Sequence, residues 1–243
     1  HSSCKFVASN AGGLSASVDL LHIDSEKEFR MSFYRSGKYE TARLGQIANL
    51  VHRTGGSVLD IGHAQAFNPY LPAVRTTGFD RISVDDCPYF EQIQGDVVEI
   101  NFLLAGRNFD TVIAGELIEH LENPYAFLRN IRNLISPGGR VILSTPNPVA
   151  FPTLFCEWVR TNHLFYDVDH TYYFAPRWVE RLLAKSGYRV HDIQSVGLWP
   201  FPKIPVPSGL SYQIIYSANP EAEMPEPFAE SNDTVAGRRG LAP

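Results

Sequence analysis

Runs of apolar residues separated by amphipathic stretches extend over most of the chain, the arrangement expected when strands alternate with helices. Short apolar runs predict strands at 57–61, 81–85, 91–95, 109–114, 141–144, 188–196 and 211–217. Apolar positions spaced three and four residues apart, together with capping patterns, predict helices at 39–53, 67–74, 125–135, 152–160 and 176–186, and a helix start at 25–28. This alternation favours an α/β fold: a doubly wound, mainly parallel seven-stranded sheet with helices on both faces.

The most informative stretch covers residues 109–147. Its apolar strand ends at Gly115-Glu116, and Glu119 and His120 follow closely. An amphipathic helix, the turn Ser136-Pro-Gly-Gly139 and a second apolar strand complete the stretch. Open α/β sheets bind ligands at the carboxyl ends of their strands. The ionisable side chains after the first of these two strands are therefore predicted to lie at a binding site.

Three parts of the chain differ in composition. Residues 1–37 are predicted to form an N-terminal segment and helix that contribute part of a lid. Residues 38–217 form the predicted α/β domain, with 148–175 and 197–210 as loops on its substrate side. Residues 218–243 are rich in glutamate, proline and small side chains, which is typical of a disordered tail.

Composition narrows the choice of partners and compartment. A net charge of −5 disfavours a large sequence-independent contact with nucleic acid. Cys4, Cys87 and Cys156 lack the spacing of a zinc site or a disulfide framework, so a reducing compartment is expected. The chain has no apolar run approaching the roughly 20 residues of a membrane span and shows no secretory signal pattern. We therefore predict a cytoplasmic protein, a monomer or homodimer, without a membrane partner.

The segment Val58-Leu-Asp-Ile-Gly62 and the 109–147 stretch together resemble the class I methyltransferases that depend on S-adenosylmethionine (SAM), in particular the O-methyltransferases of the ubiquinone pathway and their small-molecule relatives. The resemblance implies a Rossmann-like methyltransferase fold and a SAM site, with S-adenosylhomocysteine as product. It places Asp60 and Gly62 at the cofactor loop, where His63 could also touch the cofactor. It places Gly115 and Glu116 near the methionine end of the cofactor.

Two further acids complete the cofactor site that this resemblance implies. Asp85, at the end of the predicted strand 81–85, would accept hydrogen bonds from the ribose hydroxyls, with Asp80 and Asp86 as weaker candidates. Asp96, in the segment Gly95-Asp96-Val97, would accept from the adenine amine, and Val97 would lie beside it.

The first loop departs from the family pattern, because Ala64 and Ala66 stand where glycines are usual. Glycine adopts positive φ without steric cost, whereas an alanine forced into that region costs about 1–2 kcal/mol. Two readings follow: a tolerated variant of the loop, or a lost cofactor site.

The motif Glu-x-x-Glu-His at Glu116, Glu119 and His120 also resembles that of the small-RNA 3′-terminal 2′-O-methyltransferases, in which this motif and a later histidine hold a divalent cation. By that resemblance, Glu116, Glu119, His120 and His170 could bind Mg²⁺ or Mn²⁺. Nitrogen ligands favour Mn²⁺ over Mg²⁺. Without metal, His120 or His170 could act as a general base, because imidazoles titrate near neutral pH.

The expected activity is methyl transfer from SAM to a hydroxyl oxygen of a small molecule: a sugar, a phenol or a natural-product intermediate. Glu116, His120 and His170 are the predicted catalytic residues. The alternatives are RNA 2′-O-methylation and a non-catalytic module that binds a protein partner. Arg35, Lys38 and Arg43 are interpreted as solvated charges on helix faces.

Overall fold

A computed structural model describes residues 37–64, 67–158, 170–198, 204 and 206–222. The predicted helix start at 25–28, most of the N-terminal segment 1–37 and most of the predicted tail lie outside these residues.

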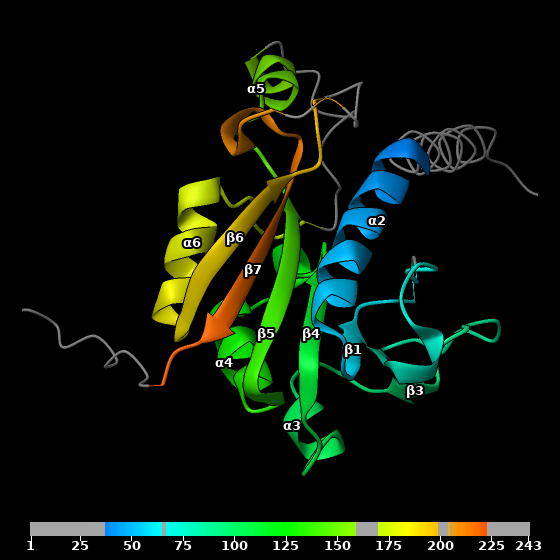
Figure 1. Cartoon of the computed structure of the whole chain (residues 1–243). Coiled ribbons are helices and arrows are strands. Elements are labelled where there is room, and N and C mark those ends of the chain that lie inside the picture. Colours follow the sequence, from blue (N-terminus) through cyan, green and yellow to red (C-terminus); the bar gives the residue numbers. More distant parts are fainter. Residues whose placement is uncertain (1–36, 65–66, 159–169, 199–203, 205, 223–243) are drawn as a thin grey trace, which may run out of the picture.

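The described residues form one seven-stranded sheet in the order β3-β2-β1-β4-β5-β7-β6 (Figure 1). The pairs from β3 through to β5 are parallel, whereas β7 runs antiparallel to both β5 and β6. This arrangement confirms the predicted doubly wound, mainly parallel sheet. Its strands are β1 (Val58–Ile61), β2 (Thr76–Asp80), β3 (Glu91–Gln94), β4 (Phe109–Gly115), β5 (Ile135–Pro146), β6 (Tyr188–Ser195) and β7 (Gln213–Pro220).

Helices cover both faces of the sheet, with α2 in front and α4 and α6 behind it in Figure 1. Asn123 caps α4 by accepting a hydrogen bond from the amide of Ala126. Pro124 occupies the first turn, where a backbone N–H would have no partner within the helix. No described helix is both long and apolar enough to cross a membrane. The helices are α2 (Gly37–Thr54), α3 (Ile100–Leu103), α4 (Pro124–Arg132), α5 (Phe151–Trp158) and α6 (Pro176–Lys185), with 3-10 turns η1 (Ala73–Arg75), η2 (Ile118–His120) and η4 (Ser208–Leu210).

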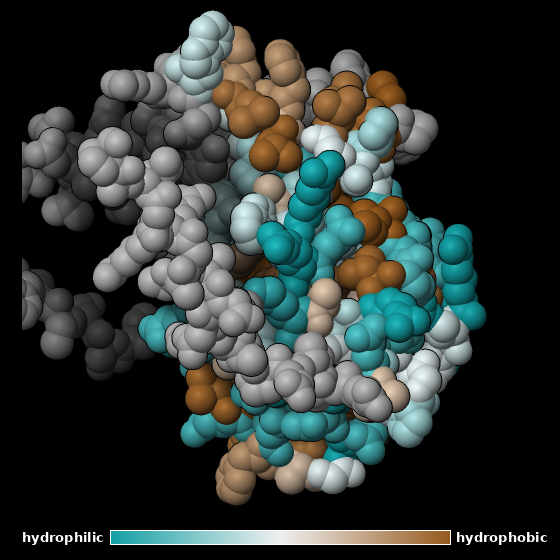
Figure 2. Space-filling model, turned by 90° about the vertical axis from the view of Figure 1, so that its left-hand side faces the viewer, coloured by the Kyte–Doolittle hydropathy of each residue, from teal (hydrophilic) through white to brown (hydrophobic). Residues whose placement is uncertain are grey.

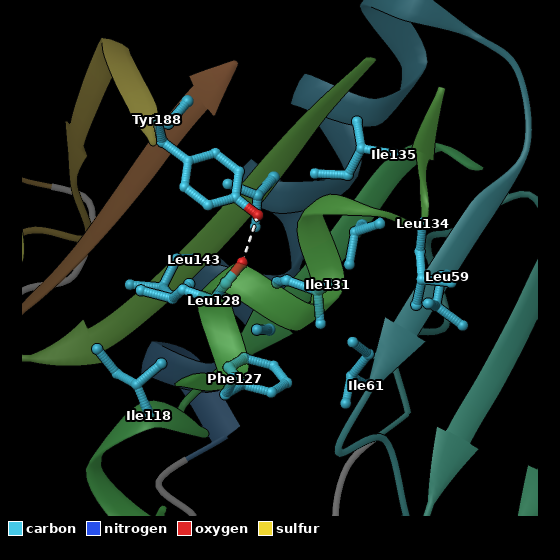
Figure 3. Close-up of a cluster of buried hydrophobic side chains, with 14 of the residues drawn as sticks. Leu59, Ile61, Ile118, Phe127, Leu128, Ile131, Leu134, Ile135, Leu143 and Tyr188 are labelled. Atoms are coloured by element: carbon cyan, nitrogen blue, oxygen red, sulfur yellow. Dashed lines mark hydrogen bonds between the residues drawn. The ribbon is translucent and has the colours of Figure 1, made fainter. Parts of the chain in front are cut away.

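Two apolar cores lie on the two faces of the sheet. The larger core packs α3, α4 and α6 against the sheet, and the smaller packs the stripe Ile47, Leu50 and Val51 of α2 against the other face. Figure 3 shows the larger core, where the buried Tyr188 hydroxyl donates to the carbonyl of Leu128 at 2.8 Å. This bond satisfies a polar group that would otherwise be costly inside an apolar cluster.

Two predicted elements were wrong, and both errors fall between β1 and β3. The second strand is Thr76–Asp80, not 81–85, and residues 81–85 form bends and a turn in which Ile82 is exposed. The predicted helix 67–74 is absent apart from η1, because Pro69 and Pro72 lack the N–H groups that a helix needs. The β1–β2 and β2–β3 connections therefore contain no α-helix among their described residues.

Apolar side chains gather at the top of the molecule, over α5 (Figure 2). Phe151, Leu154, Phe155 and Trp158 are exposed at helical spacing, while Thr153 of the same helix is buried. These apolar side chains are exposed, whereas an ordinary surface helix buries its apolar stripe.

Candidate functional site

The site lies at the edge of the sheet where the parallel strands β1, β2 and β4 end and β7 begins. All four residues of β1 are buried, so Asp60 lies inside the sheet, one residue before the strand ends at this edge. Gly62 follows directly, at a φ of +81°. The structure thus brings the predicted cofactor loop and the end of β4 to one edge of the sheet.

Ala64 fits the cofactor loop without the backbone strain predicted for it. Glu116 is the one non-glycine residue with positive φ among the described residues, so Ala64 does not occupy the left-handed region. Its amide instead donates to Oδ2 of Asp80 at 2.8 Å. Ala66 lies outside the described residues. At Ala64, therefore, the loss of glycine does not disrupt the loop.

Asp80, rather than Asp85, is the acid at the carboxyl end of β2. Its Oδ1 accepts from the amide of Ile82 at 3.1 Å, so both carboxylate oxygens face backbone of the two neighbouring loops. Asp85 lies five residues beyond the strand in an exposed turn, which corrects its predicted position. A carboxylate has about four acceptor sites, so Asp80 retains capacity for ribose hydroxyls.

Asp96 occupies the loop after β3, as the predicted adenine contact requires. Its Oδ1 accepts from the amide of Val98 at 3.0 Å, and its Oδ2 lies 3.7 Å from the Arg81 guanidinium. Val97 is half-buried and packs against the larger core.

His63 turns towards the sheet and is buried. Its ring lies over Gly78, where an added Cβ would approach the imidazole Cε1 within 2.6 Å, and its Nε2 is 3.1 Å from Oε1 of Gln92. Gln92 also bonds both backbone groups of Val84. His63 thus ties the loop after β1 to β2 and β3.

Asp60 is buried beneath this loop. The Tyr89 hydroxyl donates to its Oδ2 at 2.6 Å. Burial raises the pKa of Asp60 to about 6, although the bond from Tyr89 and the nearby charges of His63 and Arg43 oppose this increase.

Glu116 stands at the end of β4 with a φ of +52°. Its carboxylate accepts from the Ser144 hydroxyl at 3.1 Å and from the Gln213 side-chain amide at 3.0 Å. Arg43 of α2 donates to the same Ser144 oxygen at 3.2 Å. A left-handed glutamate is a sparsely populated conformation, and it persists here because β5 and β7 hold its side chain through Ser144 and Gln213.

Arg43 is buried, which corrects its interpretation as a solvated charge. Its guanidinium reaches the end of β4 because Gly115 has no side chain: an added Cβ would lie 2.8 Å from Nη1. Glu40, one turn earlier, is 3.6 Å away. The signal was present in the sequence, since Arg43 occupies the same helical stripe as Ile47 and Leu50.

Glu119, His120 and His170 form a second group at the same edge, and we call it the acid–imidazole cluster. Their potential ligand atoms all lie within 4.8 Å of one another. His120 and His170 meet edge to face, with ring centroids 4.6 Å apart. The amides of Thr171 and Tyr172 both donate to the Glu119 carbonyl, which anchors the segment of His170 beside η2.

Glu116 does not belong to this cluster, so the predicted four-residue metal set becomes three residues. Glu119 is 1 % exposed, and neither carboxylate oxygen makes a hydrogen bond of normal geometry within the described residues. Burial and then the negative charge of Glu116 raise the pKa of Glu119 well above its ordinary value, partly offset by Arg43 and the nearby Thr145 hydroxyl.

The strand order, with an antiparallel β7 between β5 and β6, and the acids at the carboxyl ends of the strands define a Rossmann-like methyltransferase domain. A family model described as a methyltransferase domain matches residues 34–193. The chain belongs to this family.

Curated relatives share only part of this chain. A ubiquinone biosynthesis O-methyltransferase of Cereibacter sphaeroides is 41% identical over 87 residues, which are 34% of this chain and 35% of that protein. The enzyme of the same name from Parvibaculum lavamentivorans is 29% identical over 105 residues, 40% of each chain. The chain thus matches between about a third and two fifths of the length of these relatives.

Solved structures share the fold at low identity. A SAM-dependent methyltransferase of Thermotoga maritima, a possible histamine N-methyltransferase, has a TM-score of 0.55 at 16% identity and covers 77% of this chain and 96% of its own. A 1,6-didemethyltoxoflavin N1-methyltransferase of Burkholderia thailandensis, with bound S-adenosylhomocysteine, has a TM-score of 0.52 at 15% identity and covers 88% and 93%. These similarities establish the fold.

Proposed function

We propose that the protein transfers a methyl group from SAM to a hydroxyl oxygen of a small molecule. The acid–imidazole cluster of Glu119, His120 and His170, in which Glu119 is buried, carries the proposal, because it places proton-accepting groups beside the cofactor edge of a methyltransferase fold. The names of the curated relatives, ubiquinone biosynthesis O-methyltransferases, support oxygen as the accepting atom.

The cofactor edge fits SAM in shape and charge. Gly62 has the positive φ of a tight loop, Ala64 is unstrained, and Gly115 lets the Arg43 guanidinium reach the end of β4. In this proposal Asp80 accepts from the ribose hydroxyls and Asp96 from the adenine amine. Arg43 and Glu116 offer a cation and a carboxylate to the zwitterionic methionine end.

SAM supplies an electrophilic methyl group on a sulfonium. The chain has to orient the acceptor hydroxyl and remove its proton, and much of the rate gain comes from that positioning. In the proposal His120 or His170 accepts this proton.

The same cluster also suits a divalent cation. Two imidazoles and the buried Glu119 carboxylate offer an N,N,O donor set, which favours Mn²⁺ over Mg²⁺. A bound cation would also offset the cost of burying the Glu119 carboxylate, and its charge would favour the deprotonated form of a coordinated hydroxyl.

Calorimetric titration of S-adenosylhomocysteine into the purified chain tests the cofactor site. We expect micromolar binding by the wild type and at least a tenfold loss, about 1.4 kcal/mol, in Asp80→Ala, since the ribose loses its acceptor. Asp85→Ala is the matched control and should bind like the wild type. No binding by the wild type at millimolar ligand would refute the proposed function, and a loss confined to Asp85→Ala would reverse the assignment of the ribose acid.

Titration of Mn²⁺ into the same protein tests the cation. The wild type should gain thermal stability with added Mn²⁺, because the ion binds the folded state alone. Glu119→Gln and His170→Ala should lose this gain, whereas His191→Ala, a histidine of β6 bonded to Ser217, should keep it. Equal gains in all four proteins would exclude the cluster as the site.

A further inference from the structure

We propose that Tyr89 is a positioning residue for the cofactor loop: its hydroxyl fixes Asp60 and Asn68 and so sets the shape of the SAM site. This role rests on the function proposed above. Tyr89 belongs to the β2–β3 connection, well away in sequence from the loop that it would control.

The Tyr89 hydroxyl is the centre of a buried hydrogen-bond chain. It donates to Oδ2 of Asp60 at 2.6 Å and accepts from the amide of Asn68 at 2.7 Å. The side-chain amide of Asn68 then donates to the carbonyl of Leu44 in α2 at 2.9 Å. Asp60, Asn68 and Tyr89 are each at least 93 % buried. One phenol therefore joins β1, both connections and α2.

The need for such a link follows from the short connections. The described residues of the β1–β2 and β2–β3 connections form no α-helix, and Phe67, Leu71, Cys87 and Tyr89 pack beside α2 on this face of the sheet. Loops have no internal ladder of hydrogen bonds to fix them, so their conformation depends on individual side-chain contacts. The Tyr89 ring also contacts His63, with centroids 5.5 Å apart, and Phe67, at 6.5 Å.

The link acts through Asp60, because the acid lies two residues before Gly62 and three before His63. A hydroxyl that donates to a carboxylate makes a stronger bond when the carboxylate is charged. The charged or titratable groups around Asp60 are His63, Arg43 and Asp80, with Cys87 next to Tyr89. The loop is thus held most firmly when Asp60 is ionised, and its hold weakens as Asp60 takes up a proton.

The experiment compares Tyr89→Phe with Tyr216→Phe, which removes the hydroxyl of another buried tyrosine, one that makes no hydrogen bond within the described residues. Affinity for S-adenosylhomocysteine is measured from pH 5 to 8 by calorimetry. Wild type and Tyr216→Phe should gain affinity as the pH rises through about 6, the pKa of Asp60. Tyr89→Phe should bind about tenfold more weakly at pH 7, with its midpoint at higher pH.

The midpoint is expected to rise because the lost hydrogen bond is one that lowers the pKa of Asp60. A purely structural loss of stability would weaken binding without moving the midpoint. Binding with the same affinity and midpoint in both variants would overturn the positioning role and leave the proposed function standing. Absence of binding by the wild type would overturn both.

Discussion

The environment of the Glu119 carboxyl strongly opposes its charge. It is buried, neither oxygen makes a hydrogen bond of normal geometry to another described residue, and the neighbouring charge of Glu116 repels it. Such a group stabilises the fold only while it is protonated: its contribution is complete below its unfolded pKa and is lost as the pH rises through its higher folded pKa.

Replacing Glu119 by glutamine should therefore stabilise the metal-free protein. At pH 8 we expect the free energy of unfolding to rise by about 1–3 kcal/mol, because the variant no longer buries a charge. The gain should shrink as the pH falls, since wild-type Glu119 then takes up a proton. Urea unfolding between pH 5 and 8 measures both effects, with the exposed Glu122→Gln as control. A gain that is independent of pH would contradict the assignment of Glu119 as a destabilising charge.

At this scale the sequence predicted residues that lie within recognisable local motifs. Gly62, Asp96 and the Glu119–His120 pair all lie at the sheet edge where their motifs placed them. The helical stripe of α2 indicates that Arg43 is buried, but its partner Ser144 is distant in sequence and could not be predicted. The same holds for Tyr89, whose partners are Asp60 and Asn68.

Among the elements, β2 shows why a strand was misplaced. The segment 81–85 has more apolar character than Thr76-Thr-Gly-Phe-Asp80, yet the latter pairs with β1. Thr76 and Thr77 are buried, and their β-branched side chains suit a strand. Gly78 leaves room for the His63 ring. Only the packing of neighbouring strands distinguishes the two segments, and composition does not carry that information.

Gly78 and Gly45 provide a matched pair at this scale. Gly78→Ala should lower the free energy of unfolding by about 1–3 kcal/mol, since its methyl group would displace the buried His63 ring from Gln92. Gly45→Ala, within α2 and with open space around it, should raise it by about 0.5–1 kcal/mol through helix propensity. Urea unfolding of both variants measures these two changes in the free energy of unfolding. A stabilising effect of Gly78→Ala would show that the His63 ring is not held over Gly78.

At the scale of the whole molecule, the alternation of strands and helices was sufficient to predict a seven-stranded sheet. The reason is that apolar strands must be buried under the apolar faces of the helices. The position of β7 between β5 and β6 could not be derived from periodicity, since strand order depends on contacts across the chain. The lack of an α-helix in the described residues after β1 likewise escaped the pattern, because an apolar loop such as Phe67–Leu71 has the same composition as a short buried helix.

The place of β7 also has a consequence during synthesis. The chain is made from its amino end, so β1 to β5 can assemble while β7 has not yet left the ribosome. Until then β5 lies at the open margin of the nascent sheet, with the backbone groups that later meet β7 unpaired. The buried strand β5 thus stays unprotected along this margin until β7, which pairs with β6, closes it.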